Sequence, residues 1–118
     1  MPLNVSSHVL EPSPIYPYAV TAKRYWETIP PTLDETDPSA LTIILAHATG
    51  MHKESFEPVL EKLFELASAG LVSDGGKQKI KIREAWAIDC INHGEAATLN
   101  EKRLPTKLKE VCECPLVE

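Results

Sequence analysis

The 118-residue chain is long enough for one domain, and its 43% hydrophobic and 25% charged residues are ordinary for a globular protein. The formal net charge of −5 disfavours a nucleic-acid partner or an anionic membrane surface, because both normally require a basic face. No apolar run approaches the roughly 20 residues of a membrane-spanning helix, and the N-terminus has no signal-peptide pattern, which predicts an intracellular, by default cytoplasmic, location.

The first forty residues are rich in proline, which has no donor N–H and interrupts central strands. This region therefore predicts edge strands and loops. Residues 19–28 are the best strand candidate within it, because β-branched and aromatic side chains combine there with charged ones that suit an exposed edge. Residues 29–39 are predicted to form a turn and a loop, with two proline-containing breaks.

Residues 41–47 form the clearest strand, nearly continuously apolar and β-branched at its centre. That pattern is typical of a strand covered on both faces, as in a parallel α/β sheet. After a turn of small residues, Ser55 is predicted to cap a helix, Pro58 to lie in its first turn and Gly70 to follow its end. Apolar residues recur along this helix at helical spacing and predict a core-facing stripe of Phe56, Leu60, Leu63, Phe64 and Ala67.

A polar connector at residues 73–79 leads into a second strand at residues 81–89. The order strand, helix, strand predicts one βαβ unit with parallel strands and a right-handed crossover. From Leu99 onward the chain is charged and weakly patterned, so residues 1–100 are assigned to the domain and residues 101–118 to an unassigned tail. The predicted fold class is therefore α/β.

The chain contains three cysteines, Cys90, Cys112 and Cys114, and such an odd, sparse set does not form a disulfide framework. Cys112 and Cys114 stand too close in the chain for an easy mutual disulfide, and a C-x-C pair alone is a weak metal signal. We therefore expect three reduced, non-catalytic thiols, and the sequence predicts neither a metal site nor a cofactor.

Polar segments follow both strands of the βαβ unit: His47-Ala48-Thr49-Gly50 and Asp89-Cys90-Ile91-Asn92-His93-Gly94. In open α/β sheets, ligands collect at the carboxyl ends of the strands, so both segments are expected at one site. The first segment resembles the turn after the third strand of the α/β-hydrolase superfamily. The second resembles the turn after that family's fourth strand, with Asp89, His93 and Gly94 in place. Ala48 stands where glycine is usual, a variant seen in a branch that includes fungal enzymes. The segments Ile-Leu-Ala-His-Ala-Thr-Gly and Ala-Ile-Asp-Cys-Ile-Asn-His-Gly resemble segments of fungal hydrolases in that branch, which includes peroxisomal lipase-like proteins and proteins of host-selective toxin clusters.

The resemblance covers about residues 19–100 and implies a partial α/β-hydrolase sheet, with N-terminal strands, one βαβ unit and one amphipathic helix. It also implies that the first turn supplies an oxyanion-hole donor, with Thr49 giving the backbone N–H and Ala48 and Gly50 lining the turn. Acyl transfer builds negative charge on the former carbonyl oxygen, and a preorganised N–H at a dry site stabilises that charge by about 3 kcal/mol. The open alternative is that these small residues only make a tight strand-to-helix turn. Four further residues are expected to shape the loops rather than to react or to bind metal: His47, Asp89, His93 and Gly94.

A serine hydrolase needs a nucleophile on a G-x-S-x-G elbow, an acid and a histidine base, and these 118 residues contain no such elbow. The nearest serines, Ser68 and Ser73, lack the first glycine, so no catalytic residue is assigned. The family's catalytic domain is roughly twice this length or more, which leads us to expect a truncated ester or acyl hydrolase that is inactive alone. A small-molecule ester or acyl substrate is expected for a full-length form, and the resemblance implies fungal secondary-metabolite, or toxin, biosynthesis as its setting.

Two other functions stay open. One is a non-enzymatic fragment that binds a partner hydrolase or self-associates through an unpaired sheet edge, expected at the strand after Lys79. The other is a small complete α/β domain with a ligand site around Thr49 and His93. A peroxisomal location is expected for full-length relatives alone, because this chain ends in Leu-Val-Glu rather than in a tripeptide like Ser-Lys-Leu.

Overall fold

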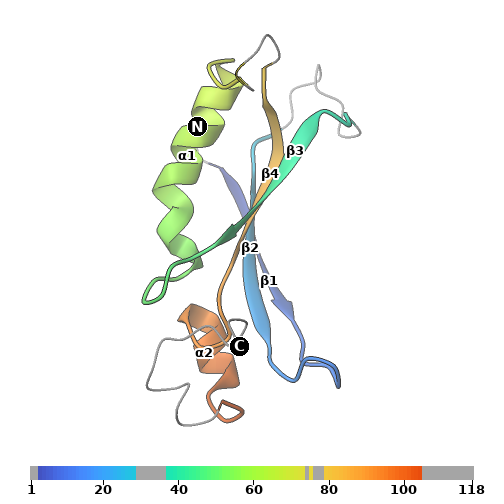
Figure 1. Cartoon of the computed structure of the whole chain (residues 1–118), viewed down its shortest axis with the longest axis vertical. Coiled ribbons are helices and arrows are strands. Elements are labelled where there is room, and N and C mark those ends of the chain that lie inside the picture. Colours follow the sequence, from blue (N-terminus) through green and yellow to red (C-terminus); the bar gives the residue numbers. More distant parts are fainter. Residues whose placement is uncertain (1–2, 29–36, 74, 76–78, 105–118) are drawn as a thin grey trace.

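The computed structural model of the chain describes residues 3–28, 37–73, 75 and 79–104. Within these ranges, strands form one sheet in the order β1-β2-β4-β3 (Figure 1). β1 (Asn4–Leu10) pairs antiparallel with β2 (Val20–Trp26), and β2 pairs antiparallel with β4 (Lys81–Ile88). β4 pairs parallel with β3 (Ala40–Ala46). The sheet is therefore mixed, with its parallel pair at the β3 side.

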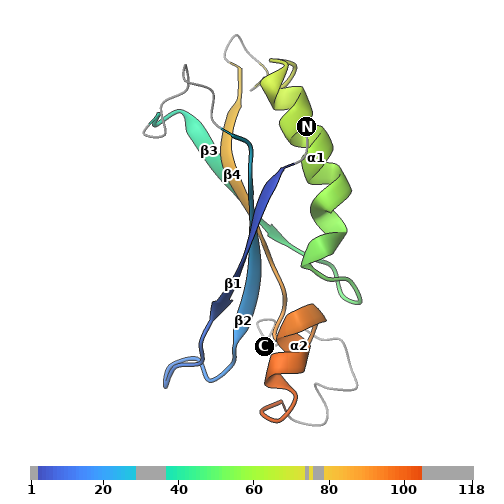
Figure 2. The same ribbon diagram turned by 180° about the vertical axis from the view of Figure 1, so that it is seen from behind.

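Between the two parallel strands the chain forms a short 3-10 turn, η1 (Lys53–Phe56), and the helix α1 (Glu57–Ser68). The βαβ unit and the amphipathic helix predicted from the sequence are thus confirmed. Figures 1 and 2 show α1 lying along one face of the sheet. The core between them is a cluster of buried side chains: Tyr25, Leu60, Phe64, Ala85 and Ala87. Burial of Leu60 and Phe64 stabilises the fold by about 1.5–3 kcal/mol each, and the small alanines of β4 leave room for them.

The ends of α1 follow the sequence prediction in part. Pro58 lies in the first turn, where its missing N–H costs little, as expected. At the other end, the Leu71 N–H donates to the Leu66 carbonyl at 2.9 Å and the Gly70 N–H donates to the Ala67 carbonyl at 3.0 Å, so Gly70 closes a Schellman motif. The expectation that Ser55 caps the helix was wrong. Ser55 lies inside η1, and its Oγ accepts a hydrogen bond from the His52 N–H at 3.4 Å.

Two expectations about the sheet were also wrong. β3, predicted at residues 41–47, is not covered on both faces, because Leu41 is 50% exposed and Ile44 is 70% exposed. The reason is that β3 is an edge of the described sheet and α1 covers one face alone. The unpaired sheet edge was predicted at the strand after Lys79, which is β4. In the structure β4 pairs with both β2 and β3 and lies inside the sheet. The described edges are β1 and β3.

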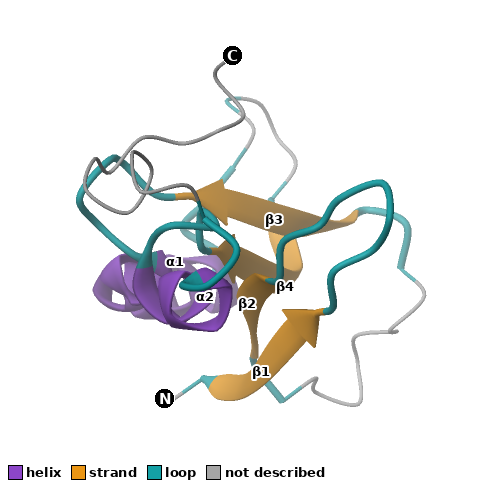
Figure 3. Cartoon of the chain, turned by 90° about the horizontal axis from the view of Figure 1, so that it is seen from below, coloured by secondary structure: helices purple, strands orange, loops and turns teal. Residues whose placement is uncertain are grey.

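The helix α2 (Gly94–Asn100) was not predicted from the sequence. It lies at the end of the sheet where β4 ends, and Figure 3 shows it on the same side of the strands as α1. Asn100, at its last turn, is fully buried and connects α2 to the start of β2. Most of the predicted tail, from residue 105 on, lies outside the described residues, as do Cys112 and Cys114. None of the helices in the described ranges is long and apolar enough to cross a membrane.

Candidate functional site

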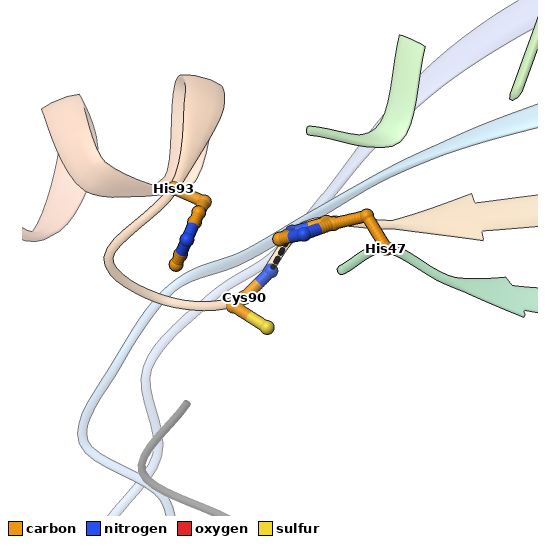
Figure 4. Close-up of side chains that lie close together, drawn as sticks. All are labelled: His47, Cys90 and His93. Carbon is orange, nitrogen blue, oxygen red and sulfur yellow. Dashed lines mark hydrogen bonds between the residues drawn. The ribbon is translucent and has the colours of Figure 1, made fainter. Parts of the chain in front are cut away.

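Two turns meet where β3 and β4 end, as expected for the carboxyl ends of parallel strands. The imidazole of His47, just after β3, lies against that of His93, with ring centroids 4.8 Å apart. The Cys90 N–H donates to His47 Nε2 at 3.0 Å, and the Gly50 N–H donates to His93 Nε2 at 3.2 Å. Figure 4 shows His47, Cys90 and His93 gathered at this point. The two sequence segments that follow the strands thus form one site.

The hydrogen bonds assign a neutral tautomer to both histidines. Each Nε2 accepts a backbone N–H and therefore presents a lone pair, so the ring proton sits on Nδ1. His47 Nδ1 then donates to the Ala48 carbonyl at 2.9 Å, and His93 Nδ1 donates to Asn92 Oδ1 at 2.7 Å. Each ring is held at both nitrogens, and together the two rings link the turn after β3 to the turn after β4.

The turn after β3 is a β-turn closed by a hydrogen bond from the Met51 N–H to the Ala48 carbonyl at 3.0 Å. Gly50, at its third position, has φ +84°, which favours glycine, although a Cβ there would meet open space. The Gly50 and Met51 amides both have acceptors. Thr49 is exposed, and no described group accepts a hydrogen bond from its backbone N–H. The amide that the resemblance implies as oxyanion donor is therefore available to an outside acceptor.

Asp89, directly after β4, is 2% exposed and joins three parts of the chain. Its carboxylate accepts hydrogen bonds from Thr21 Oγ1 at 2.8 Å, from the Lys53 N–H at 2.9 Å and from Lys53 Nζ at 2.6 Å. His47 Nε2 lies 3.9 Å from the same carboxylate. These contacts connect β2 and η1 to the end of β4. The structure thus surrounds Asp89 with positioning contacts and buries it away from solvent.

Lys53 is the main residue of the site that the sequence did not reveal. It stands among charged residues of a loop, a pattern typical of solvated side chains, yet its side chain is 1% exposed. Its ammonium contacts Asp89 at 2.6 Å, Glu54 at 2.8 Å and Glu95 at 3.2 Å. Burial opposes the charge of Lys53, but hydrogen bonds to Asp89 and Glu54 outweigh burial and raise the pKa of Lys53. Burial likewise works to raise the pKa of Glu54, but the Lys53 ammonium lowers it to about 2.

Gly94 begins α2 with φ +54°, close to the Asp89 carboxylate. A Cβ at this position would lie 2.7 Å from Asp89 Oδ1 and 2.8 Å from Oδ2, closer than real Cβ atoms approach. We expect Gly94→Ala to lower the free energy of unfolding by about 2–4 kcal/mol, because left-handed backbone costs roughly 1–2 kcal/mol and displacement of the carboxylate adds to it. Urea unfolding followed by circular dichroism measures this loss.

Gly75→Ala is the matched control for that variant. Gly75 also has positive φ, +84°, but a Cβ there would meet nothing within 4 Å. Its substitution should therefore cost the backbone part alone, roughly 1–2 kcal/mol. Equal losses for the two variants would contradict the close approach of Gly94 to Asp89.

We expect His93 to make the stability of the fold depend on pH. Its burial, and then the neighbouring His47, hold the pKa of His93 below its ordinary value of 6.5. The unfolded chain therefore takes up this proton at a higher pH than the folded chain does, and stability is lost as the pH falls below about 6.5. The slope expected from one proton is at most about 1.4 kcal/mol per pH unit.

Urea unfolding at a series of pH values above about 5 tests this dependence, and His93→Gln should reduce it. Glu54 does not interfere in that range. Its pKa is lowered from 4.5 to about 2, so its contribution to stability is complete above 4.5 and is lost only at lower pH. A pH dependence that is the same with and without His93 would show that another group causes it.

The same site contains a group of side chains that could hold a metal ion. The ligand atoms of His47, Cys90 and His93 all lie within 4.8 Å of one another. The sequence predicted no metal site, because His47 and His52 have the spacing of a loop and no carboxylate motif completes a site. His47, Cys90 and His93 come together through the pairing of two strands, which the sequence does not display directly.

The fold is similar to part of a known protein structure. No family model matches the chain, and no curated protein matches it. Among solved structures, it is similar to the peroxisomal alpha-beta-hydrolase Lpx1 of Saccharomyces cerevisiae, with a TM-score of 0.57 and 21% identity. The likeness covers 88% of this chain but 28% of the yeast protein. It shows that the chain has part of the α/β-hydrolase fold, so the predicted fold class is confirmed, and that the chain spans less than a third of the yeast protein's length.

Proposed function

We propose that this chain, which has part of the α/β-hydrolase fold, supplies the oxyanion side of a site that cleaves esters or acyl compounds. The observation that carries the proposal is the turn from Ala48 to Met51. Its Gly50 and Met51 amides are engaged within the fold, whereas the Thr49 N–H, at the carboxyl end of β3, has no acceptor among the described residues. A donor held in place before the reaction begins is what stabilisation of a developing oxyanion requires.

We assign no nucleophile to the two serines that come nearest to the elbow pattern, Ser68 and Ser73. Ser68 ends α1, and Ser73 lies shortly before β4 begins, so both lie toward the end of the sheet opposite to Thr49. Ser68 Oγ also donates a hydrogen bond to Glu27. Neither serine therefore approaches the proposed oxyanion donor, and the chain alone is expected to hydrolyse little. A small-molecule ester or acyl substrate, and a pathway of fungal secondary-metabolite or toxin biosynthesis, belong to the same proposal and are supported by the sequence resemblance.

The test joins this chain to the part of the yeast hydrolase that the structural match leaves out, and measures hydrolysis of a short-chain 4-nitrophenyl ester. Thr49→Pro removes the N–H, and proline suits the second position of a β-turn, so the turn itself should persist. We expect Thr49→Pro to lower kcat by about 100- to 1000-fold, as for loss of one oxyanion donor. Thr49→Ala keeps the N–H and is the control, expected within a few-fold of the parent chimaera.

Two results would count against the oxyanion role. One is equal activity of the Thr49→Pro and Thr49→Ala chimaeras. The other is a chimaera that is folded by circular dichroism yet inactive, while the intact yeast protein hydrolyses the ester in the same assay.

A second candidate function is self-association through β3, the edge strand of the described sheet. Ile44 and Leu41 are 70% and 50% exposed on it, and an apolar strand edge is a template for pairing with another chain. Light scattering over a range of protein concentrations decides this candidate, since a monomer throughout would argue against it.

A further inference from the structure

Two imidazoles and one thiol meet at the ends of β3 and β4, and the proposed function uses none of them as a ligand (Figure 4). The His47 side chain is 1% exposed, and His93 as a whole residue is 5% exposed. Cys90 is half-buried beside them. Their ligand atoms all lie within 4.8 Å of one another. A tetrahedral zinc site places such atoms about 3.3–3.6 Å apart, given zinc–sulfur and zinc–nitrogen bonds of about 2.3 and 2.0–2.1 Å. Metal binding would therefore have to draw the three ligand atoms closer together.

The two histidines already have the tautomer that a metal ligand needs. In metal sites, the ring nitrogen that does not bind the ion donates its proton to an oxygen, which fixes the ring and its lone pair. Here His47 Nδ1 donates to the Ala48 carbonyl at 2.9 Å, and His93 Nδ1 donates to Asn92 Oδ1 at 2.7 Å. Both Nε2 atoms therefore carry a lone pair, which now accepts a backbone N–H, that of Cys90 at His47 and that of Gly50 at His93.

The local charges also favour a cation. The Asp89 carboxylate lies 3.9 Å from His47 Nε2. In the adjoining ionic cluster the Lys53 ammonium contacts three carboxylates, those of Asp89, Glu54 and Glu95, and a second ammonium, that of Lys23, pairs with Glu54 at 3.5 Å, so three negative charges stand against two positive ones. A divalent ion next to this cluster would meet an excess of negative charge.

We propose that His47 Nε2, His93 Nε2 and Cys90 Sγ bind a thiophilic divalent cation, with Zn²⁺ as the ion that fits them. Imidazole and thiolate are ligands that zinc prefers, and three protein ligands leave a fourth position open. On binding, the Cys90 thiol loses its proton to solvent and the thiolate bonds to the metal. The ion takes the place of the two backbone N–H groups as the partner of the Nε2 lone pairs. This inference does not depend on the oxyanion role of Thr49.

The test uses the full chain with Cys112→Ser and Cys114→Ser, so that the C-x-C pair of the tail cannot bind the probe. Co²⁺ is added first, because thiolate ligation gives a sulfur-to-cobalt charge-transfer band in the near ultraviolet, and Zn²⁺ should then displace Co²⁺ and abolish the band. Calorimetric titration with Zn²⁺ should show one ion bound per chain. Either of two results with this chain would overturn the proposal: a Co²⁺ complex without the charge-transfer band, or no uptake of Zn²⁺.

Substitutions at the site then identify the ligands. In the same background, Cys90→Ser or His93→Gln should weaken Zn²⁺ binding by more than the roughly 10- to 100-fold that loss of an outer hydrogen bond costs. Asn92→Ala, which removes such an outer bond, should weaken it by roughly 10-fold. His52→Gln is the matched control, because the His52 side chain is 53% exposed and lies outside the cluster. Zn²⁺ affinity that falls equally for His52→Gln and His93→Gln would place the ion elsewhere.

Discussion

Asp89→Asn is expected to lower the free energy of unfolding by about 3–5 kcal/mol, because it leaves the buried Lys53 ammonium without its nearest counter-charge. Asparagine keeps the size of the side chain, but an amide nitrogen replaces one of the two carboxylate oxygens and cannot accept a hydrogen bond. At least one of the hydrogen bonds that Thr21 and Lys53 donate to Asp89 is therefore lost. A loss of this size is a large part of the total stability of a small domain, commonly about 5–15 kcal/mol. Urea unfolding followed by tryptophan fluorescence and circular dichroism measures it.

Glu65→Gln is the matched control for Asp89→Asn, since it also exchanges a carboxylate for an amide. Glu65 pairs with Lys62 at 3.5 Å, but both side chains are about two-thirds exposed, at 64% and 65%. Its removal should cost less than about 0.5 kcal/mol. A Lys53→Met, Asp89→Asn double variant that is more stable than Asp89→Asn alone would show that the unpaired ammonium causes the loss. Equal stability of Asp89→Asn and Glu65→Gln would contradict this account of the ionic cluster.

Asn100→Ala is expected to cost about 3–4 kcal/mol of unfolding free energy. The Asn100 side chain is fully buried, accepts a hydrogen bond from the Ala19 N–H at 2.7 Å and donates to the carbonyls of Ala19 at 2.8 Å and Ile91 at 3.0 Å. Alanine would leave these three buried backbone groups without partners, and each unsatisfied group costs roughly 1–3 kcal/mol before water or local movement compensates. Urea unfolding measures the loss, and faster amide hydrogen exchange at Ala19 would locate it.

Asn4→Ala is the control for the Asn100 substitution. Asn4 is exposed, and its side chain donates one long hydrogen bond, 3.3 Å, to Thr28 Oγ1. Its removal should change the unfolding free energy by less than about 0.5 kcal/mol. If Asn100→Ala cost no more than Asn4→Ala, the side chain would not hold α2 against the start of β2.

Local signals were sufficient to predict the central part of the fold. The apolar run before His47 predicted β3, the stripe with Leu60 and Phe64 predicted the buried face of α1, and Gly70 predicted where that helix ends. These features depend on residues close together in the chain, where periodicity and backbone preference act directly. The two strand-end segments were expected at one site because parallel strands end at the same edge, and the contact of His47 with His93 agrees with that.

The remaining features depend on residues far apart in the chain, and local pattern does not encode them. Lys53 reads as a solvated loop residue, and its burial follows from Asp89, which reaches it only after β3 and β4 have paired. Asn100 reads as a polar residue near the end of the patterned sequence, yet it bonds to the backbone at Ala19. The strand order placed β4 between β2 and β3, so the exposed edge fell on β3 instead. In each case tertiary pairing, not propensity, decides the environment.

The proposed function gives this chain the oxyanion side of a hydrolase-type site and not its nucleophile. This division is tested by treating the folded chain with a fluorophosphonate, which phosphonylates activated serines with loss of fluoride, and then determining the mass of the intact chain. We predict that the mass stays unchanged under conditions in which a serine hydrolase is labelled completely. A single stoichiometric adduct on a serine of the folded chain, absent after unfolding in urea, would contradict the claim and identify the nucleophile.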